Sequence, residues 1–319
     1  MATTSRANPA WVGPGVLLVV ATAVVSGVST FLNGYAVAGT SSAAFVTVRN
    51  LAVAGLLAPI ALFVLARRGV HLTRRDAGTL AVIGLVGGAV PFLLFFRGLQ
   101  LAAEAHGTLT ASFVYRTLFV FASVFGVVAL RERAHPRAAL AAALVLAGNL
   151  ALMALVSPVW TDGSLYVLLA TVLWAVEYTI SKRALGHLAG TTVGLGRMGF
   201  GAAFLSGYLL VTGGWGAVAA FSPGQWSWVG ISAALLAVFV LTWYTGLARV
   251  DLGVATTVLV LGFPISWMLE VVATGSPVAP LAALGAAAVA VGVLVALGAR
   301  SLRAAWRYPL GARRPLATD

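Results

Sequence analysis

The sequence predicts an all-α membrane protein with ten transmembrane helices, arranged as two inverted five-helix repeats with both termini in the cytoplasm. Three observations lead to this prediction. First, 61% of the 319 residues are hydrophobic and only 9% are charged, with a mean hydropathy of +1.00. Such a chain has too few polar side chains to cover a water-soluble surface. Second, the basic residues gather in alternate loops, and third, a sequence pattern recurs at a spacing of 144 residues.

Ten apolar runs, each bounded by charged residues, glycine or proline, are long enough to cross ~30 Å of hydrocarbon as helices. A helix is expected because lipid offers no partners for free backbone N–H and C=O groups. The short alternating segments of a β-barrel are absent from the sequence. The predicted helices comprise residues 14–37, 42–66, 77–101, 106–130, 136–156, 163–184, 190–212, 225–248, 251–273 and 278–299.

Loop charges predict the orientation. Sixteen of the twenty basic residues fall in segments that lie inside if the N-terminus is cytoplasmic, and the loops on the other side contain none. Because cytoplasmic loops are enriched in arginine and lysine, both termini are predicted to be cytoplasmic. We therefore expect a multi-pass protein of the inner (plasma) membrane.

The recurring pattern predicts an internal duplication. Residues 136–148 and 280–292 share a leading proline, an Ala-Ala-Leu step and a final glycine. Two halves of five helices each must be antiparallel, which gives an inverted repeat. This architecture predicts a binding site near the membrane midplane and alternating access. The predicted organisation is a cytoplasmic N-terminus (1–13), two five-helix repeats (14–156 and 163–299) and a basic cytoplasmic tail (300–319).

Several motifs carry a family resemblance. The stretch LLATVLWAVEYTISKRAL (168–185) opens the second half, and an arginine lies early in the second and seventh helices, as Arg49 and Arg197. Glu132 belongs to the Leu-Arg-Glu-Arg sequence that ends the fourth helix, and Pro264 lies in the ninth. With the five-plus-five layout, the whole chain resembles the drug/metabolite transporter (DMT) superfamily in its ten-helix EamA-type branch. The resemblance implies a carrier, usually an exporter, of small metabolites or drugs.

Besides the sixteen basic residues of the inner segments, four arginines lie inside the predicted helices, namely Arg49, Arg97, Arg116 and Arg197. An arginine at the centre of a membrane helix costs ~2.5–3.5 kcal/mol on insertion scales. We therefore expect these side chains to face the protein interior, where each is a candidate for function. Arg97 is the exception, because it can reach the outer interface.

Glu177 and Arg197 are predicted to lie at one depth in consecutive helices, where they could pair. The pair would serve as a structural or gating contact, or in coupling and substrate contact. Glu177 is the only carboxylate well inside a predicted helix, so it is the candidate for proton coupling. Arg49 lies at the mirror depth in the outer half. Glu270, near the outer end of the ninth helix, is a candidate partner for Arg49 or for Arg97. The predicted gating or coupling residues are Glu177, Arg197, Arg49 and Glu270.

Arg116 is the predicted anchor for substrate. It falls near the middle of the fourth helix with no obvious carboxylate at its depth, and Tyr115 lies beside it. A structural partner elsewhere in the fold is the alternative. Aromatic side chains of three other helices could line the same cavity, or could serve packing alone. The predicted substrate-binding residues are Arg116, Tyr115, Trp174, Tyr178, Trp243, Tyr244 and Trp267.

The excess of positive charge inside the membrane favours an anionic or zwitterionic substrate, because a lipophilic cation would be repelled. We expect a secondary transporter, by resemblance an exporter, of a small organic solute such as an amino acid or another zwitterionic or anionic metabolite. Two alternatives stay open. The first is export of cationic drugs or quaternary amines through Glu177, and the second is flipping of an amphipathic lipid-linked molecule.

Other signals are interpreted as structural. The glycines of residues 194–201 lack the lysine and the preceding strand of a phosphate loop, and they favour close helix packing, as do Gly84 and Gly88. The four histidines lie scattered at helix ends and cysteine is absent, so no metal site is predicted. We expect no enzymatic activity, cofactor or nucleic-acid partner. The expected partners are a small-molecule substrate and the lipid bilayer, for a monomer or homodimer.

Overall fold

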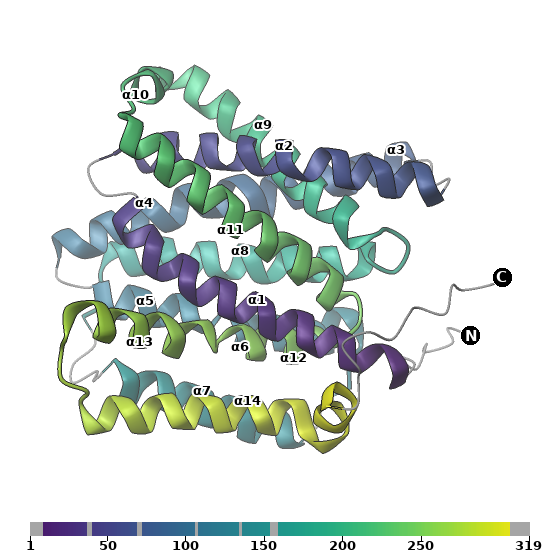
Figure 1. Cartoon of the computed structure of the whole chain (residues 1–319), viewed down its shortest axis with the longest axis vertical. Helices are drawn as coiled ribbons and strands as arrows, with labels where there is room; N and C mark the ends of the chain where they lie inside the picture. The colour runs from purple at the N-terminus through teal and green to yellow at the C-terminus, as the bar shows by residue number, and fades with distance from the viewer. Residues whose placement is uncertain are drawn as a thin grey trace.

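Helices that run along one common direction form the described chain in the computed structural model (Figure 1). The structure describes residues 9–36, 40–68, 72–105, 108–133, 136–153 and 159–306, and no strand occurs within these ranges. The elements are α1 (Pro9–Ala36), α2 (Ser42–Arg68), α3 (Arg74–Ile83), the π-helix η1 (Gly84–Ala89), α4 (Val90–Glu104), α5 (Thr108–Arg116), α6 (Leu118–Leu130), α7 (Pro136–Leu152), α8 (Asp162–Ala184), α9 (Gly190–Val211), α10 (Trp215–Ala219), α11 (Pro223–Leu247), α12 (Leu252–Leu259), α13 (Gly262–Thr274) and α14 (Pro280–Trp306).

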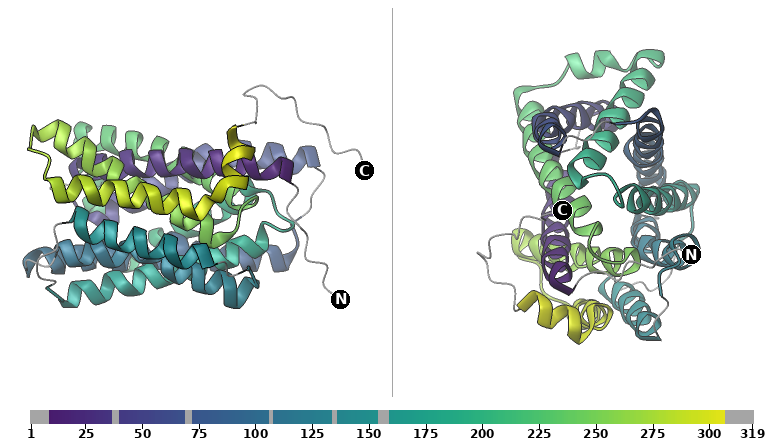
Figure 2. Two further views of the ribbon diagram at one scale, coloured as in Figure 1. Left: turned by 90° about the horizontal axis from the view of Figure 1, so that it is seen from below. Right: turned by 90° about the vertical axis from the view of Figure 1, so that its right-hand side faces the viewer.

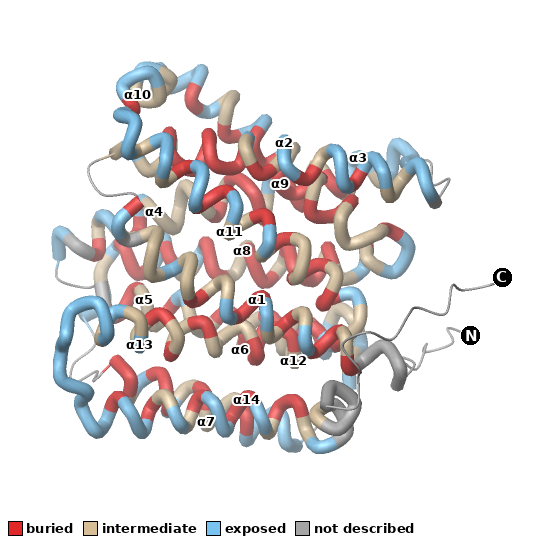
Figure 3. Tube along the Cα trace, viewed as in Figure 1, coloured by how far each residue is buried: buried red, intermediate tan, exposed pale blue. Residues whose placement is uncertain are grey.

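Nine helical segments of the described chain are long and apolar enough to cross a membrane. Large apolar side chains such as Phe63, Val128 and Val211 are exposed on them. Exposed positions follow the outer faces of the bundle and buried positions face inward (Figure 3), as expected for helices surrounded by lipid. The protein is therefore a multi-pass membrane protein.

The one predicted span that is not among these nine, residues 136–156, corresponds to α7, which is apolar but has only 17 residues. At ~1.5 Å per residue, α7 is about 26 Å long, slightly shorter than the hydrocarbon core. Its predicted extension to residue 156 lies outside the described residues. The count of ten crossings therefore stays a prediction.

The beginning of α1 and the end of α14 lie at the same end of the bundle, here called the terminal end, and the opposite end is called the far end (Figures 1 and 2). The helix α1 runs away from the terminal end, whereas α8 runs toward it. The helix pairs α1–α11, α4–α8, α2–α9 and α7–α14 make the most extensive contacts. Because the equivalent first helices of the two halves run in opposite directions, this arrangement agrees with an inverted repeat.

Glycines allow several of these helices to approach closely. A Cβ on Gly88 would collide with the backbone of α9 at Arg197 and Gly201, and a Cβ on Gly148 would meet the Gly285 carbonyl oxygen at 2.6 Å. A Cβ on Gly292, the repeat partner of Gly148, would also meet α7. The repeated glycine thus serves one interface between α7 and α14. The packing role expected for Gly88 and Gly201 agrees with the structure, whereas a Cβ on Gly199 would meet nothing within 4 Å.

Two predicted helices are broken near their middle. The predicted helix 106–130 divides into α5 and α6 at Thr117, whose hydroxyl donates to the Val114 carbonyl oxygen at 2.6 Å. The predicted helix 251–273 divides into α12 and α13 at residues 260–261. Pro264 causes the second break, because it lacks an N–H and its ring clashes with the carbonyl of Val260. The breaks at Thr117 and Leu261 are 144 residues apart, which is the spacing of the repeat.

Two further boundaries differ from prediction. The predicted helix 77–101 contains the π-helix η1, which redirects backbone carbonyls between α3 and α4. The last helix was predicted to end at residue 299, but α14 continues to Trp306 after a kink at Gly298 (φ 66°, ψ 160°). The predicted tail is therefore helical in its first described residues, because Gly298 redirects the helix without ending it.

Candidate functional site

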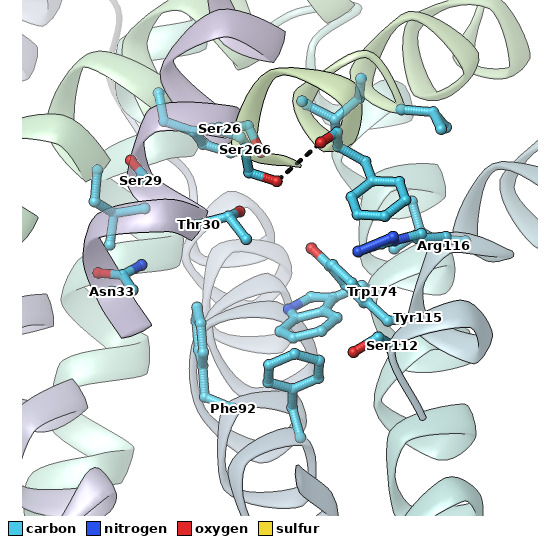
Figure 4. Close-up of a pocket in the computed structure, with 18 of the residues that line it drawn as sticks. Ser26, Ser29, Thr30, Asn33, Phe92, Ser112, Tyr115, Arg116, Trp174 and Ser266 are labelled. Atoms are coloured by element: carbon cyan, nitrogen blue, oxygen red, sulfur yellow. Dashed lines mark hydrogen bonds between the residues drawn. The ribbon is translucent and has the colours of Figure 1, made fainter. Parts of the chain in front are cut away.

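A cavity of about 400 Å³ lies inside the bundle, between α1, α4, α5, α8, α11 and α13 (Figure 4). This volume suits a small organic solute. The α1 residues that line it lie in the half of that helix nearer the far end. The lining segments α4 and α5 are themselves the parts of the interrupted helices nearer the far end, so the cavity extends from the middle of the bundle toward that end. Its charged lining residues are Arg49, Arg116 and Arg197, and aromatic lining residues include Phe92, Phe95, Tyr115, Trp174, Tyr178 and Phe263.

Arg116 ends α5 at the first helix break and points along the cavity (Figure 4). Its guanidinium lies over the ring of Phe263 on α13, and its Nη1 atom is buried without a hydrogen-bond partner. Arg116 therefore offers a donor to any solute that enters.

Arg49 is a second incompletely paired cation. Its side chain is 4% exposed, its Nε atom is buried without a partner, and its Cζ lies 5.1 Å from the centroid of the Phe92 ring. Its Nη2 atom donates a long hydrogen bond to Asn50 Oδ1 at 3.4 Å. Glu270, the predicted partner, is exposed and forms no ion pair with Arg49 within the described ranges. The expected Arg49–Glu270 contact is therefore not formed.

Aromatic rings build one wall of the cavity. The Trp174 ring centroid lies 5.4 Å from those of Phe92, Phe95 and Tyr115, and Trp174 Nε1 donates to the Gly87 carbonyl oxygen at 3.0 Å. The π-helix makes that carbonyl available, because its main chain departs from the regular α-helical pattern. Tyr115 and Trp174 thus line the cavity, and their role in binding substrate stays a prediction.

Glu177 and Arg197 form the predicted ion pair, with 3.7 Å between Oε2 and Nε. Glu177 Oε1 also accepts hydrogen bonds from Ser181 Oγ at 2.5 Å and from Tyr244 Oη at 2.8 Å. Arg197 Nη2 donates to the Gly87 carbonyl oxygen at 3.2 Å. A Cβ at Gly87 would overlap Glu177, so the glycine permits this close approach. Glu177 is fully buried beside the cavity but is not among its lining residues.

The remaining predicted site residues occupy different places. Tyr178 lines the cavity. Trp243 and Tyr244 are fully buried outside the lining, with the Trp243 ring centroid 4.7 Å from that of Tyr178. Trp267 is half-buried and also outside the lining. The prediction placed these three by helix and depth, whereas rotation about the helix axis decides whether a side chain reaches the cavity.

A polar face of α1 was missed by the sequence reasoning. Ser26, Ser29, Thr30 and Asn33 all line the cavity. Their spacing of i, i+3, i+4 and i+7 places them on one side of a helix. This spacing in an otherwise apolar span was the signal that could have revealed them.

The terminal end of the bundle is closed by contacts at helix ends. Glu132, after α6, accepts a hydrogen bond from the backbone N–H of Leu252 at 2.7 Å, at the start of α12. Lys182 Nζ donates to the carbonyl oxygens of Leu247 and Val250 at 2.6 and 2.7 Å. Arg183 Nη2 donates to the Ala129 carbonyl oxygen at 2.7 Å. The Glu132 and Arg183 contacts tie the first repeat to the second, and the Lys182 contacts join α8 to the end of α11 within the second repeat.

Burial raises the pKa of the Glu132 carboxyl above its ordinary value of 4.5. Hydrogen bonds from the N–H groups of Leu252 and Gly253 lower this pKa, as does the charge of Lys182, whereas the charge of Asp251 raises it. The loss of hydration is the largest of these effects. Glu132 therefore titrates at a higher pH in this closed arrangement than when exposed.

A comparison with protein families supplies the decisive observation. The model of the EamA-like transporter family matches residues 13–154 and, a second time, residues 161–298. The chain belongs to the EamA-like transporter family. It is therefore a membrane transporter of small solutes, and each predicted repeat corresponds to one EamA-like unit.

Solved structures support the fold of this EamA-like transporter. One, described only as "Crystal structure of protein", aligns with a TM-score of 0.69 over 88% of this chain and 97% of its own, at 19% sequence identity. At this identity the similarity concerns the fold alone. The curated proteins give no match. Within the described residues, no group of three or more His, Cys, Asp or Glu side chains could hold a metal ion.

Proposed function

We propose that this EamA-like transporter is a secondary transporter that exports a small organic anion or zwitterion, such as an amino acid or another carboxylate-bearing metabolite. The observation that carries the proposal is that Arg116 Nη1 and Arg49 Nε lack hydrogen-bond partners in the cavity, and neither arginine forms an ion pair within the described residues. Arg197 Nε also lacks a hydrogen bond, but it lies 3.7 Å from Glu177 Oε2. The family match supports small-solute transport. Export and location in the inner (plasma) membrane are the expectations of the family resemblance.

Unpaired buried donors favour an anionic ligand. Buried polar groups normally have hydrogen-bond partners, and a buried charge is costly unless it is paired. A carboxylate presents two acceptor oxygens in the geometry that a guanidinium group recognises. A carboxylate-bearing solute would therefore supply the acceptors that Arg116 and Arg49 lack in the described structure. Tyr115 and Trp174 would pack against its apolar body.

The cationic-drug alternative has less support. It requires Glu177 to accept a substrate cation, yet Glu177 Oε1 accepts from Ser181 and Tyr244 while Oε2 faces Arg197. Glu177 is also not among the cavity-lining residues. A cation entering the cavity would instead meet three arginines.

For transport, we propose alternating access in which the two repeats move about the cavity. The cavity extends toward the far end, while Glu132, Lys182 and Arg183 form contacts that close the terminal end. Glu177–Arg197 would belong to the inner gate and Arg49 to the outer gate. Proton coupling would act through Glu177, because its protonation would release Arg197 from its counter-charge.

The direct test is solute counterflow in proteoliposomes with three probe classes, namely amino acids, aromatic and aliphatic carboxylates, and quaternary ammonium ions. Wild-type protein should exchange carboxylates or amino acids. Arg116→Ala should reduce the exchange at least tenfold, because a charge-assisted contact contributes about 1.5–3 kcal/mol. Arg97→Ala, at an exposed arginine outside this cavity, is the matched control and should retain exchange.

Two results would contradict the proposal. Exchange of quaternary ammonium ions that is lost with Glu177→Gln and kept with Arg116→Ala would indicate the cationic-drug exporter. Movement of a labelled lipid-linked anion between leaflets, without exchange of soluble solutes, would indicate a flippase. Equal exchange by wild type and Arg116→Ala would remove the recognition role of Arg116.

A further inference from the structure

The polar face of α1 differs in character from the arginine side of the cavity. Ser26, Ser29, Thr30 and Asn33 carry neutral hydroxyl and amide groups, and they lie opposite Tyr115, Arg116 and Trp174 (Figure 4). Polar side chains within the membrane are unfavourable unless they form hydrogen bonds. The hydrogen-bonding groups of these four residues therefore indicate which chemical groups a solute in the cavity carries.

Hydrogen bonds within the protein satisfy this face only in part. Asn33 Oδ1 accepts from Ser232 Oγ on α11 at 2.8 Å, which fixes the orientation of its amide group. The Ser29 hydroxyl oxygen is buried with no hydrogen-bond partner in the described structure. Arg49, which lines the same cavity and is 4% exposed, also has an unpartnered atom, Nε. Neutral and cationic side chains with unpartnered atoms thus both line one cavity.

We infer that this α1 face is a neutral hydrogen-bonding subsite, and that the transported anion carries a hydroxyl or amide group at the end remote from its carboxylate. The inference rests on the proposed function, because the carboxylate is assigned to Arg116 and Arg49. Ser29 and the Asn33 amide would bind the neutral group, and the rings of Tyr115 and Trp174 would flank the body between the two ends. An anion that lacks the remote polar group leaves Ser29 unpaired and is discriminated against.

The test compares two competitors that differ by one hydroxyl, 4-hydroxyphenylacetate and phenylacetate, in the counterflow assay described above. Wild-type protein should bind the hydroxylated anion roughly three- to tenfold more tightly, since one neutral hydrogen bond contributes this much to binding. Ser29→Ala should abolish the difference by weakening only the hydroxylated competitor. Asn33→Ala should have the same selective effect.

Thr22→Val is the matched control on the same helix. The Thr22 hydroxyl is fully buried, donates to the Leu18 carbonyl oxygen at 2.7 Å and pairs with Thr242 Oγ1 at 2.8 Å, outside the cavity lining. This variant should keep the preference for the hydroxylated anion. Thermal unfolding of each variant in detergent reports whether it has folded, so loss of fold is not mistaken for loss of recognition.

The outcomes separate this inference from the proposed function. Competition by both anions with equal strength in wild type would overturn the neutral subsite and leave the anion transporter intact. Equal weakening of both competitors by Ser29→Ala would also overturn it, because the side chain would then act on the cavity as a whole. Competition by neither anion, alongside competition by quaternary ammonium ions, would overturn the proposed function together with the inference.

Discussion

The three arginines that line the cavity differ in how their charges are compensated. Each has a buried nitrogen without a hydrogen-bond partner, but Arg197 has the Glu177 carboxylate at 3.7 Å, whereas Arg116 and Arg49 form no ion pair within the described residues. Compensation by a fixed partner favours a structural or gating role. Incomplete compensation favours a role in binding a solute that arrives from outside. The same residue type therefore serves two purposes within one bundle.

Removal of the Glu177 carboxylate should destabilise the fold. Glu177→Ala leaves Arg197 buried without a counter-charge and removes the acceptor of the Tyr244 hydroxyl. Breaking a buried pair in this way costs about 3–5 kcal/mol, so the thermal unfolding midpoint in detergent should fall by several degrees. Glu270→Ala, at an exposed carboxylate, is the control and should unfold like wild type.

A second substitution tests the origin of that loss. The double variant Glu177→Ala with Arg197→Met removes both charges, and it should recover part of the lost midpoint. An unfolding midpoint of Glu177→Ala equal to that of wild type would show that the ion pair adds nothing to stability.

At the scale of elements, the two interrupted helices are central to the site. Arg116 lies at the end of α5, and Phe263 lies at the start of α13. On the side of the terminal end, α6 packs directly on α12, whereas α5 and α13 make no comparably extensive contact. Both α5 and α6 pack on α8, and both α12 and α13 pack on α1. The breaks thus allow α5 and α13, nearer the far end, to line the cavity. Nearer the terminal end, α6 and α12 pack together in a closed seam.

The contact between η1 and α9 should be intolerant of added volume. Gly88→Ala places a methyl group against the Arg197 carbonyl oxygen, and the neighbouring atoms are backbone that cannot move aside. We expect a loss of about 1–3 kcal/mol in the free energy of unfolding, the range for overpacking. Gly207→Ala on α9 is the control, because no atom lies within 4 Å of its added Cβ. It should stabilise the helix slightly, and equal unfolding midpoints for both variants would contradict the packing assignment.

The seam between α6 and α12 should open more readily without Glu132. Glu132→Ala removes the acceptor of the Leu252 N–H, whereas Glu132→Gln retains an amide oxygen in its place. Ala255 is fully buried on α12 and the natural chain has no cysteine, so Ala255→Cys provides a single reporter. A permeant thiol reagent should modify it faster in the Ala variant and near the original rate in the Gln variant. Equal rates of Ala255→Cys modification with Glu132, Glu132→Ala and Glu132→Gln would show that Glu132 does not hold the seam closed.

The same reporter should respond to pH. Burial raises the pKa of Glu132 when the seam between α6 and α12 is closed. The protonated carboxyl therefore stabilises the closed seam relative to an open one in which Glu132 is exposed to water. Its stabilising effect is complete below about pH 4.5 and is lost as pH rises through the raised pKa. Modification of Ala255→Cys, normalised to the unfolded protein, should increase across that range. The increase should be absent in Glu132→Gln, and its persistence there would assign the effect to another group.

On the scale of the whole molecule, the cavity extends toward the far end while the terminal end is closed. If the terminal end is cytoplasmic, the structure corresponds to a state open to the outside. A cysteine at Ser112, which lines the cavity, should then react with a membrane-impermeant reagent added outside cells, whereas Ala255→Cys should not. A transported anion should protect Ser112→Cys. Reaction of Ser112→Cys only in inverted vesicles would reverse the assigned orientation.

Composition, hydropathy and the 144-residue repeat together determined the membrane class and the two EamA-like halves, because length and apolarity of a helix are properties of its own residues. The depth of a residue in the membrane was also predictable, from its distance to the ends of its helix. Glu177 and Arg197 were therefore expected to lie at one depth and to pair. The rotation of a helix about its axis and the points where a helix is interrupted were not predictable, because both depend on contacts with neighbouring helices. Only the tertiary structure directed Trp243 and Tyr244 away from the cavity, turned the polar face of α1 into it and left Arg116 unpaired.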